Sequence, residues 1–245
     1  MSAGPGAVAL VTGANKGIGL AIARQLGALG HTVLVGARDP SRGEAAAASL
    51  RAQGADARFL RIDLTDAPGI AGAAAAIDAQ FARLDVLVNN AAIKLERHPA
   101  PPSACPLERV RETYETNVFG TMAVILAMLP LLRKSPAARI VNLSSVLGSL
   151  SLAADPRSQV QRRPMLGYNT SKAAINALTL QFANELRASG IKVNAADPGY
   201  TATDMTGNDG KRTAEQAATV AVRLATLPDD GPTGGFFSEA GAVPW

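Results

Sequence analysis

The sequence predicts a single α/β domain, residues 1–245, with a doubly wound parallel β-sheet of about seven strands and helices on both faces. Short apolar runs rich in β-branched residues alternate with helical patterns along the whole chain. Hydrophobic residues make up 47% of the chain, which is enough for the core of such a domain. Polar or glycine-rich turns follow the apolar runs, where the carboxyl ends of parallel strands meet and ligands usually bind.

The order of the elements follows from these patterns. The expected strands are the apolar runs at residues 7–12, 31–37, 57–63, 84–90, 138–145, 191–197 and 235–238. The expected helices run from the turn after residue 12 to residue 29 and over residues 41–53, 67–82, 107–134, 167–187 and 213–226. Two polar segments interrupt this alternation. They are a short insertion around residues 151–165 and a glycine-containing loop around residues 200–212, which we expect to act as a substrate lid.

The composition argues against several classes of partner. The formal net charge is +4, but the only tight basic group is Arg162 with Arg163, so we expect no nucleic-acid partner. The longest apolar run, residues 118–132, is too short to span a bilayer and contains Pro130, so we expect a buried helix and no membrane partner. Cys105 is the only cysteine, which fits a reducing compartment, and we expect a cytoplasmic protein.

Metal and hydrolase chemistry are also disfavoured. The chain has two histidines, His31 and His98, and neither lies at ligand spacing from a cluster of cysteines or carboxylates. The sequence contains no G-x-S-x-G pattern, which hydrolases of the α/β class use to present a nucleophilic serine. We therefore expect no metal site.

A glycine-rich turn follows the first expected strand. The sequence T-G-A-N-K-G-I-G occupies residues 12–19 and opens the first helix. Glycine permits positive φ angles and close backbone approach, and the free N–H groups of a helix N-terminus bind phosphate. A glycine turn can merely connect two elements, but its place between strand and helix predicts a dinucleotide site in a Rossmann-type fold. The candidate residues are Gly13, Asn15, Lys16, Gly17, Ile18 and Gly19.

The end of the second strand indicates which dinucleotide is bound. NAD sites usually place an acidic residue there, whereas NADP sites favour arginine, and here Arg38 follows the strand directly. Lys16 adds a second cation, and both side chains suit a 2′-phosphate, although both could also be ordinary surface charges. The acidic Asp39, which follows Arg38, weakens the argument for a 2′-phosphate site. We expect NADP(H) to be the preferred cofactor, with NAD(H) possible.

Tyr168 and Lys172 lie four residues apart at the start of the helix at residues 167–187, so they share one helical face. A nearby ammonium group stabilises a phenolate, so we expect Lys172 to lower the pKa of Tyr168 and allow proton exchange with a substrate. This pair occurs by chance on many helices. However, Ser144 and Ser145 end the preceding strand at the same sheet edge, where a hydroxyl can hydrogen-bond a substrate carbonyl.

Several motifs together, in this order and spacing, resemble the short-chain dehydrogenase/reductase family. They are TGANKGIG, NNAA at residues 89–92, Asn117, Ser144 with Ser145, Tyr-x-x-x-Lys, and Pro198 with Gly199. The resemblance covers essentially the whole chain. It is closest to the carbonyl-reductase-like branch, because of the sequences NKGIGLAIAR, ARD and GYTATDM.

The resemblance implies a role for each matching residue. Tyr168 is then the general acid/base, and Lys172 lowers its pKa and binds the nicotinamide ribose. Ser145, rather than Ser144, orients the carbonyl, and Asn117 holds a water molecule in a proton relay. The residues implied in cofactor binding are Gly13, Asn15, Lys16, Gly17, Ile18, Gly19, Arg38, Asp63, Leu64, Asn90, Tyr168, Lys172, Pro198, Gly199, Thr201 and Thr203.

Three departures from the family pattern stand out. Ala92 replaces the usual glycine, so the turn near the cofactor must accept a methyl group, and Thr201 replaces the usual isoleucine or valine. The stretch between Ser145 and Tyr168 is longer than the commonest family spacing, and we expect it to form a polar surface segment near the substrate mouth. A larger insertion there is associated with a monomer in some carbonyl reductases, so this shorter one leads us to expect a homodimer or homotetramer.

These observations predict NADPH-dependent reduction of a small-molecule ketone or aldehyde to an alcohol. Because the chemistry is reversible, an NAD(P)-linked alcohol dehydrogenase that runs oxidatively is the nearest alternative. A non-catalytic dinucleotide sensor is a further possibility, which the presence of both Tyr168 and Lys172 disfavours. The residues of the substrate loops do not indicate one particular substrate.

Overall fold

The computed structural model describes residues 6–245 and contains one sheet of eight strands within them. Seven strands are parallel, and the last pairs antiparallel with the seventh. The sheet order is β3-β2-β1-β4-β5-β6-β7-β8. The predicted doubly wound α/β fold is confirmed, with a short hairpin at the C-terminal edge in addition. The strands are β1 (Val8–Thr12), β2 (Thr32–Ala37), β3 (Ala57–Arg61), β4 (Val86–Asn89), β5 (Arg139–Leu143), β6 (Lys192–Ala196), β7 (Phe236–Ser238) and β8 (Gly241–Ala242).

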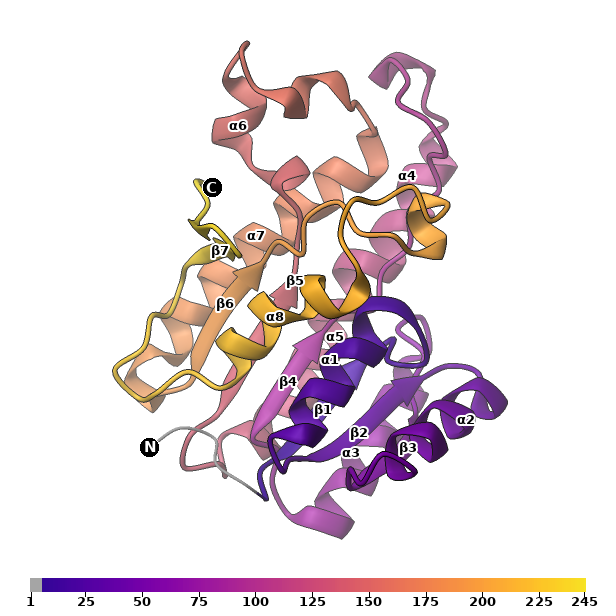
Figure 1. The fold of residues 1–245 in the computed structure, drawn as a ribbon. Helices are drawn as coiled ribbons and strands as arrows, with labels where there is room; N and C mark the ends of the chain where they lie inside the picture. Colours follow the sequence, from indigo (N-terminus) through magenta and orange to yellow (C-terminus); the bar gives the residue numbers. More distant parts are fainter. Residues whose placement is uncertain (1–5) are drawn as a thin grey trace.

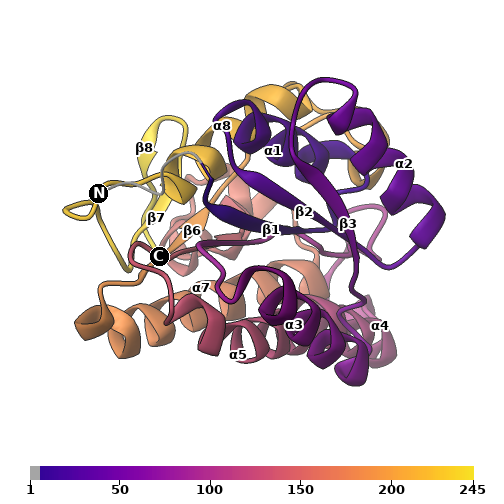
Figure 2. The same cartoon turned by 90° about the horizontal axis from the view of Figure 1, so that it is seen from below.

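Helices cover both faces of the sheet. One layer contains α1, α2 and α8, and the other contains α3, α5 and α7 (Figure 2). Successive residues of a strand point to opposite faces, so β1 contributes Val11 to the first core and Leu10 to the second. The helices are α1 (Gly17–Ala28), α2 (Pro40–Arg51), α3 (Ala67–Phe81), α4 (Leu107–Tyr114), α5 (Thr121–Leu132), α6 (Leu150–Ala154), α7 (Leu166–Leu186) and α8 (Ala214–Ala225).

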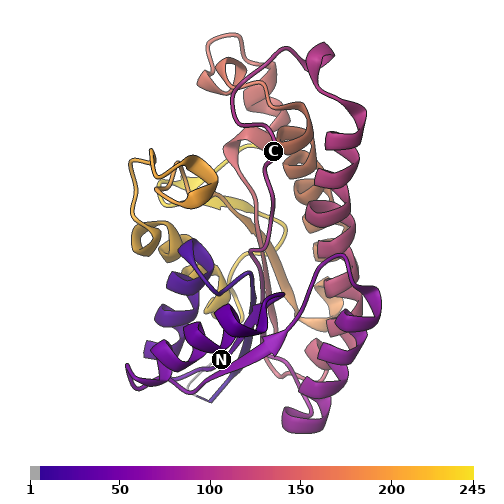
Figure 3. The ribbon, with the colours of Figure 1, turned by 90° about the vertical axis from the view of Figure 1, so that its right-hand side faces the viewer.

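The chain reverses its direction of winding between β1 and β4. From β1 it builds outward to β2 and β3, and it then returns to β4 on the other side of β1. Ligands of open α/β sheets bind outside the carboxyl ends of the strands at such a point. The long loops that follow the strands, including the insertion with α6, gather at this end of the molecule (Figures 1 and 3).

The expected helix at residues 107–134 has an irregular middle. Between α4 and α5, the segment Glu115–Gly120 is π-helical rather than α-helical. The sequence pattern did not predict this widening, because the apolar residues on both sides keep ordinary helical spacing. A π-helical turn inside a helix often marks a functional site, and this one carries Asn117.

By length and composition alone, Leu107–Leu132 is the one helix within residues 6–245 that could cross a bilayer. Half of its most apolar window is buried inside the fold, however, where Val124, Ile125 and Met128 are completely covered. A core helix that packs against a sheet in this way can have the same length and apolar composition as a helix that crosses a bilayer. The apolar run therefore reflects the buried helix that the sequence predicts.

The C-terminal segment holds the beginning of the insertion. The Ser149 hydroxyl donates a hydrogen bond to the carbonyl of Pro244 (2.7 Å), and the backbone N–H of Ser151 donates to the carbonyl of Trp245 (2.8 Å). The Trp245 ring in turn stacks on Phe236 of β7 at 5.6 Å between ring centroids. The insertion is thus tied to the edge of the sheet rather than joined to it only by its two ends.

Candidate active site

Three glycines shape the turn between β1 and α1. Gly13 and Gly17 have φ angles of +66° and +56°, which residues with a side chain rarely adopt. A Cβ atom at Gly19 would lie 2.4 Å from the Gly13 carbonyl oxygen, so another residue there would push the helix away from the turn. Glycine is therefore needed at all three positions, either for the backbone geometry or for close packing.

The N-terminus of α1 is open to a ligand. Lys16 occupies the position before the helix in an extended conformation and makes no capping bond, and the first turn contains no acidic residue. The half-buried Asn15 and Ile18 lie on either side of this helix start. Uncapped N–H groups and the positive end of the helix dipole together suit a pyrophosphate.

Arg38 lies exposed at the end of β2, and it makes no ion pair within residues 6–245. The neighbouring Asp39 caps α2 by accepting a hydrogen bond from the backbone N–H of Arg42 (3.0 Å). Asp63, after β3, accepts hydrogen bonds from the backbone N–H and the hydroxyl of Thr65 (3.0 and 2.8 Å). The Thr65 bonds and, to a lesser degree, the charge of Arg38 lower the pKa of Asp63. The acidic residue beside Arg38 therefore caps its own helix, and the Arg38 guanidinium is exposed at the end of β2.

The end of β4 is bonded directly to the glycine turn. The Asn90 side-chain amide donates hydrogen bonds to the carbonyls of Thr12 (2.9 Å) and Gly13 (3.3 Å), and its backbone N–H donates to the Thr12 hydroxyl (3.0 Å). Leu64 follows β3 and packs against the π-helical segment, since a Cβ atom on Gly120 would lie 2.6 Å from its own Cβ. Asn90 thus joins the ends of β4 and β1, and Leu64 joins the end of β3 to the π-helical segment.

Tyr168 and Lys172 lie in the first turns of α7, on one face of the helix. The Lys172 ammonium is 5.6 Å from the centroid of the Tyr168 ring. It donates a hydrogen bond to the Leu143 carbonyl at the end of β5 (2.8 Å), and only 4% of the lysine is exposed. The pair that the sequence predicted is therefore brought together, and β5 holds its amine in place.

The protonation of this pair differs from the sequence expectation. Burial raises the pKa of Tyr168, and the carboxylate of Asp197 raises it further. Burial also lowers the pKa of Lys172 to about 8. The expected lowering of the tyrosine pKa by Lys172 is not found, because the loss of solvent around the phenol is the main cause and acts in the opposite direction.

The two serines after β5 have different surroundings. Ser144 is buried, and its hydroxyl donates hydrogen bonds to the side-chain oxygen of Asn176 (2.6 Å) and the carbonyl of Lys172 (3.4 Å). Ser145 is only half-buried, and its oxygen accepts a bond from the backbone N–H of Leu147 (3.2 Å). The Ser145 hydroxyl hydrogen is therefore available to a substrate oxygen, whereas that of Ser144 is used inside the fold.

Asn117 joins three elements from its place in the π-helical segment. Its side chain accepts a hydrogen bond from the Ile93 N–H (2.8 Å) and donates to the Ile93 carbonyl (2.9 Å). It also donates to the hydroxyl of Ser171 (3.1 Å), which in turn donates to the carbonyl of Tyr168 (2.7 Å). Asn117 thereby fixes the chain after β4 against the helix that carries Tyr168.

Two departures from the family pattern are accommodated locally. Among residues 6–245, the non-glycine residues with positive φ are Ala82 and Asn208, so Ala92 adopts an ordinary backbone conformation that accepts a methyl group. Thr201 is buried, and its hydroxyl donates to the carbonyl of Gly199 (3.0 Å), so its extra polar group is satisfied within the loop.

The loop at residues 200–212, which follows Pro198 and Gly199, lies against the glycine turn. The Lys16 ammonium is 2.5 Å from a carboxylate oxygen of Asp204, and a Cβ atom on Gly17 would touch the Thr203 methyl group at 3.5 Å. The Arg163 guanidinium of the insertion stacks on the Tyr200 ring, 4.5 Å from its centroid. The loop therefore contacts both the glycine turn and the insertion.

Sequence reasoning missed Glu96, which caps α7, the helix that carries Tyr168. The α7 helix has no side-chain cap of its own. One carboxylate oxygen of the buried Glu96 accepts hydrogen bonds from the backbone N–H groups of Gly167 (2.6 Å) and Tyr168 (3.3 Å). Glu96 lies in a polar loop, 71 residues away from Gly167, so no local pattern indicated this contact.

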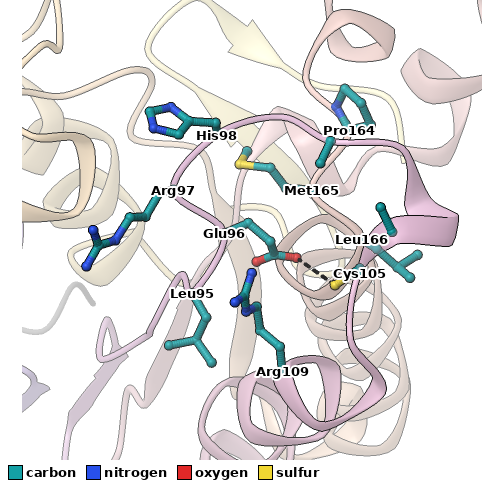
Figure 4. A pocket seen from close by; sticks show the side chains of 11 residues that line it. Leu95, Glu96, Arg97, His98, Cys105, Arg109, Pro164, Met165 and Leu166 are labelled. Carbon is teal, nitrogen blue, oxygen red and sulfur yellow. Dashed lines mark hydrogen bonds between the residues drawn. The ribbon is translucent and has the colours of Figure 1, made fainter.

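Glu96 also lines a pocket of roughly 280 Å³ between the loop after β4 and the start of α7 (Figure 4). The Cys105 thiol lies 3.9 Å from the carboxylate, and Arg109 extends toward it (Figure 4). The pocket is lined by Leu95, Glu96, Arg97, His98, Ala100, Ala104, Cys105, Arg109, Pro164, Met165 and Leu166.

Asp197 is a second residue that sequence reasoning missed. It directly follows β6 and is buried, and its carboxylate accepts a hydrogen bond from the backbone N–H of Val146 (3.1 Å). Burial is the main reason that its pKa is raised. An acidic residue directly after a strand, at the edge where the other candidate residues lie, was a signal that could have identified it.

Known proteins are similar to this chain in sequence and in fold. A family model described as short chain dehydrogenase matches residues 7–214. The human protein named carbonyl reductase [NADPH] 1 is 34% identical over 97% of this chain and 98% of its own length. The short-chain dehydrogenase anuI of Penicillium roqueforti is 37% identical over 89% of this chain and 87% of its own.

Solved structures agree with these relatives. The NADPH-bound carbonyl reductase from chicken fatty liver superposes with a TM-score of 0.85 and 29% identity, over 99% of this chain and 100% of the other. Salutaridine reductase from Papaver somniferum gives a TM-score of 0.80 with 29% identity, over 95% and 99% of the two chains. The family match spans most of the chain and includes the glycine turn, Ser145, Tyr168 and Lys172. The chain therefore belongs to the short-chain dehydrogenase family.

Proposed function

We propose that the protein is an NADP(H)-dependent oxidoreductase that reduces a ketone or aldehyde to an alcohol. One observation carries the proposal. The Tyr168–Lys172 pair and the hydroxyl of Ser145 lie at the carboxyl end of β5, at the edge of the sheet that also carries the open glycine turn after β1. The similarity to proteins named carbonyl reductase [NADPH] supports both the reaction and the cofactor.

The residues present suit NADP(H). The uncapped start of α1 would hold the pyrophosphate, and Arg38 would bind the 2′-phosphate. NADPH supplies the hydride when it is bound. The full set of proposed cofactor residues is Gly13, Asn15, Lys16, Gly17, Ile18, Gly19, Arg38, Asp63, Leu64, Asn90, Tyr168, Lys172, Pro198, Gly199, Thr201 and Thr203.

Four side chains divide the chemistry of reduction. Ser145 donates a hydrogen bond to the carbonyl oxygen and orients the substrate. Tyr168 donates its phenolic proton to that oxygen as negative charge develops on it. Lys172 stabilises the resulting phenolate and would bind the ribose hydroxyls, and Asn117 supports a water relay that returns a proton to the site.

Reduction uses a neutral phenol as proton donor. The loss of solvent around Tyr168 favours that form, because it raises the pKa of the phenol.

The test is consumption of NADPH against a panel of ketones, aldehydes and quinones, with NADH measured in parallel. We expect turnover of at least one carbonyl class, with a higher kcat/KM for NADPH than for NADH. If cofactor binds but no carbonyl compound or alcohol is converted, the protein is a dinucleotide sensor rather than an enzyme.

We further propose a cytoplasmic homodimer or homotetramer. Leu107, Phe119 and Leu126 are each at least half exposed along the helical course from α4 to α5, which supports a contact between copies of the chain. The molecular mass in solution, measured by light scattering, tests this proposal.

A further inference from the structure

Asn176 is a buried amide on the side of α7 that also carries Tyr168 and Lys172. It lies four residues after Lys172 and eight after Tyr168, so the three side chains follow one another along the helix. Only 5% of Asn176 is exposed. A buried amide costs free energy unless its polar atoms are hydrogen-bonded, so its bonding partners indicate why it is there.

Both polar atoms of the Asn176 side chain bond the segment after β5. The side-chain oxygen accepts a hydrogen bond from the Ser144 hydroxyl (2.6 Å), and the side-chain nitrogen donates to the carbonyl of Gly148 (3.1 Å). Ser144 directly precedes Ser145, and Gly148 follows Ser145 by three residues. One side chain of α7 therefore bonds both ends of the short turn that presents the Ser145 hydroxyl.

This turn, residues 144–148, is closed on itself and packs directly on α7. The Gly148 N–H donates a hydrogen bond to the Ser145 carbonyl (2.8 Å). A Cβ atom on Gly148 would lie 2.6 Å from the carbonyl carbon of Lys172, so the turn already touches the helix backbone. The turn has no room to move closer to α7, and the two Asn176 bonds keep it from moving away.

Another buried polar bond joins the same strand and helix away from the turn. The Asn142 side chain, inside β5, donates a hydrogen bond to the Thr179 hydroxyl on α7 (2.9 Å), and both residues are completely buried. This bond holds the helix against the sheet, whereas the Asn176 bonds hold the helix against the turn. Thr179 therefore provides a matched comparison for Asn176.

We propose that Asn176 is a positioning residue that holds the Ser145 turn against the helix that carries Tyr168 and Lys172. The inference rests on the proposed function, in which the hydroxyls of Ser145 and Tyr168 both bond one carbonyl oxygen. The two hydroxyls come from different elements, so their separation depends on how the turn is held against α7. Donors to an oxygen on which charge develops must be placed correctly, and a misplacement of about 1 Å can lower the rate about a hundredfold.

The variants Asn176→Leu and Asn176→Ala remove both bonds, and the smaller alanine serves if leucine does not fit. We expect kcat for reduction to fall about tenfold to a hundredfold in each variant, with a smaller change in KM, because placement of the serine hydroxyl matters most in the transition state. The NADPH dissociation constant should change little, since the Asn176 bonds reach Ser144 and Gly148 rather than the Lys172 ammonium. The value of kcat is expressed per NADPH-binding site, so that partial unfolding does not lower it.

A double-mutant cycle with Ser145→Ala separates positioning from a general structural role. Once the Ser145 hydroxyl is absent, its placement no longer matters, so Asn176→Leu should then lower kcat by less than about twofold. Thr179→Val removes the bond to Asn142, and it should lower the free energy of unfolding but leave kcat unchanged. A fall in kcat of the same size with and without the Ser145 hydroxyl would overturn the proposal.

A readout without turnover separates this inference from the proposed function. Amide hydrogen exchange, followed by mass spectrometry of the peptide that contains residues 144–149, reports how firmly the turn is held. Asn176→Leu and Asn176→Ala should each speed exchange there by about fivefold or more, as expected for the loss of one hydrogen bond, and Thr179→Val should not. If no carbonyl compound or alcohol is turned over, the proposed function fails, and the exchange alone decides whether Asn176 holds the turn. Unchanged exchange in both Asn176 variants would show that it does not.

Discussion

The cofactor side and the substrate side of the crevice are built in different ways. On the cofactor side, Gly13, Arg38 and Asn90 each directly follow a strand. The short side chains of Asn90 and Thr12 bond neighbouring strand ends. On the substrate side, three long segments, residues 93–106, 149–166 and 200–212, meet through contacts between distant positions. The sheet therefore determines where the proposed cofactor residues lie, whereas contacts between a few individual side chains determine the shape of the proposed substrate side.

The contacts on the substrate side illustrate this dependence. Glu96 reaches Gly167 across 71 residues of sequence, and the Arg163 guanidinium covers Tyr200 of the loop after β6. The sheet can form without these two contacts, so another chain with the same fold could have different contacts in their place. Substitutions on the cofactor side should therefore change the preference for NADPH over NADH. Substitutions on the substrate side should instead change the free energy of unfolding or KM for the carbonyl substrate.

The largest effect is expected where the two sides meet, at Tyr168. The Tyr168→Phe variant keeps the ring and its packing but loses the proton donor, so kcat for reduction should fall by about a hundredfold to ten-thousandfold. The NADPH dissociation constant, measured by fluorescence, should change little. Tyr114→Phe removes a phenol that packs on Phe119 instead, and it should keep full activity. Near-normal kcat in Tyr168→Phe would refute its role as general acid.

Arg38→Asp should disturb the cofactor side alone. The loss of a charge-assisted bond to the 2′-phosphate, together with the new repulsion, should lower kcat/KM for NADPH by about tenfold to a hundredfold. The value for NADH should hold or rise. Arg38→Lys keeps the charge without the planar fork, so its NADPH/NADH ratio should lie between the two. An unchanged ratio in Arg38→Asp would contradict the proposed 2′-phosphate site.

Sequence reasoning succeeded where the local pattern determines the structure. The strands, the glycine turn and the Tyr168–Lys172 pair each follow from residue type and spacing within a few positions, and the structure brings them together. It failed where burial or a distant partner decides. The raised pKa of Tyr168 depends on Asp197 and on the loss of solvent, and neither is visible in a helical pattern.

The same limit applies to the shape of the loops. The π-helical turn carries Asn117, whose bonds to Ile93 have no local signal, because the apolar spacing on either side is ordinary. The hydrogen bond from Ser149 to Pro244 joins residues 95 positions apart. The local sequence at each of these positions does not indicate its distant partner.

Glu96 tests whether the substrate loop supports the catalytic helix. In Glu96→Ala, the N–H groups of Gly167 and Tyr168 lose their acceptor, and loss of a helix cap costs about 1 kcal/mol in free energy of unfolding, and at most about 2 kcal/mol. In Glu96→Gln, the amide oxygen can still accept these bonds, so most of the stability should remain. Urea denaturation of the two variants and the parent measures the difference. Equal stability of all three proteins would show that the cap contributes nothing.

The smallest effect is expected at Arg163, which joins the insertion to the proposed lid. A cation–π contact of this exposed kind contributes about 0.5–1 kcal/mol, so Arg163→Gln should raise KM for the carbonyl substrate by at most about fivefold. Because Arg163 touches the loop and not the reacting groups, kcat and the NADPH dissociation constant should be unchanged. Arg162→Gln is the matched control, since it removes the adjacent basic side chain without touching the Tyr200 ring. If both variants behaved alike, the effect would come from net charge at the crevice mouth, and the link between insertion and lid would have no role in substrate binding.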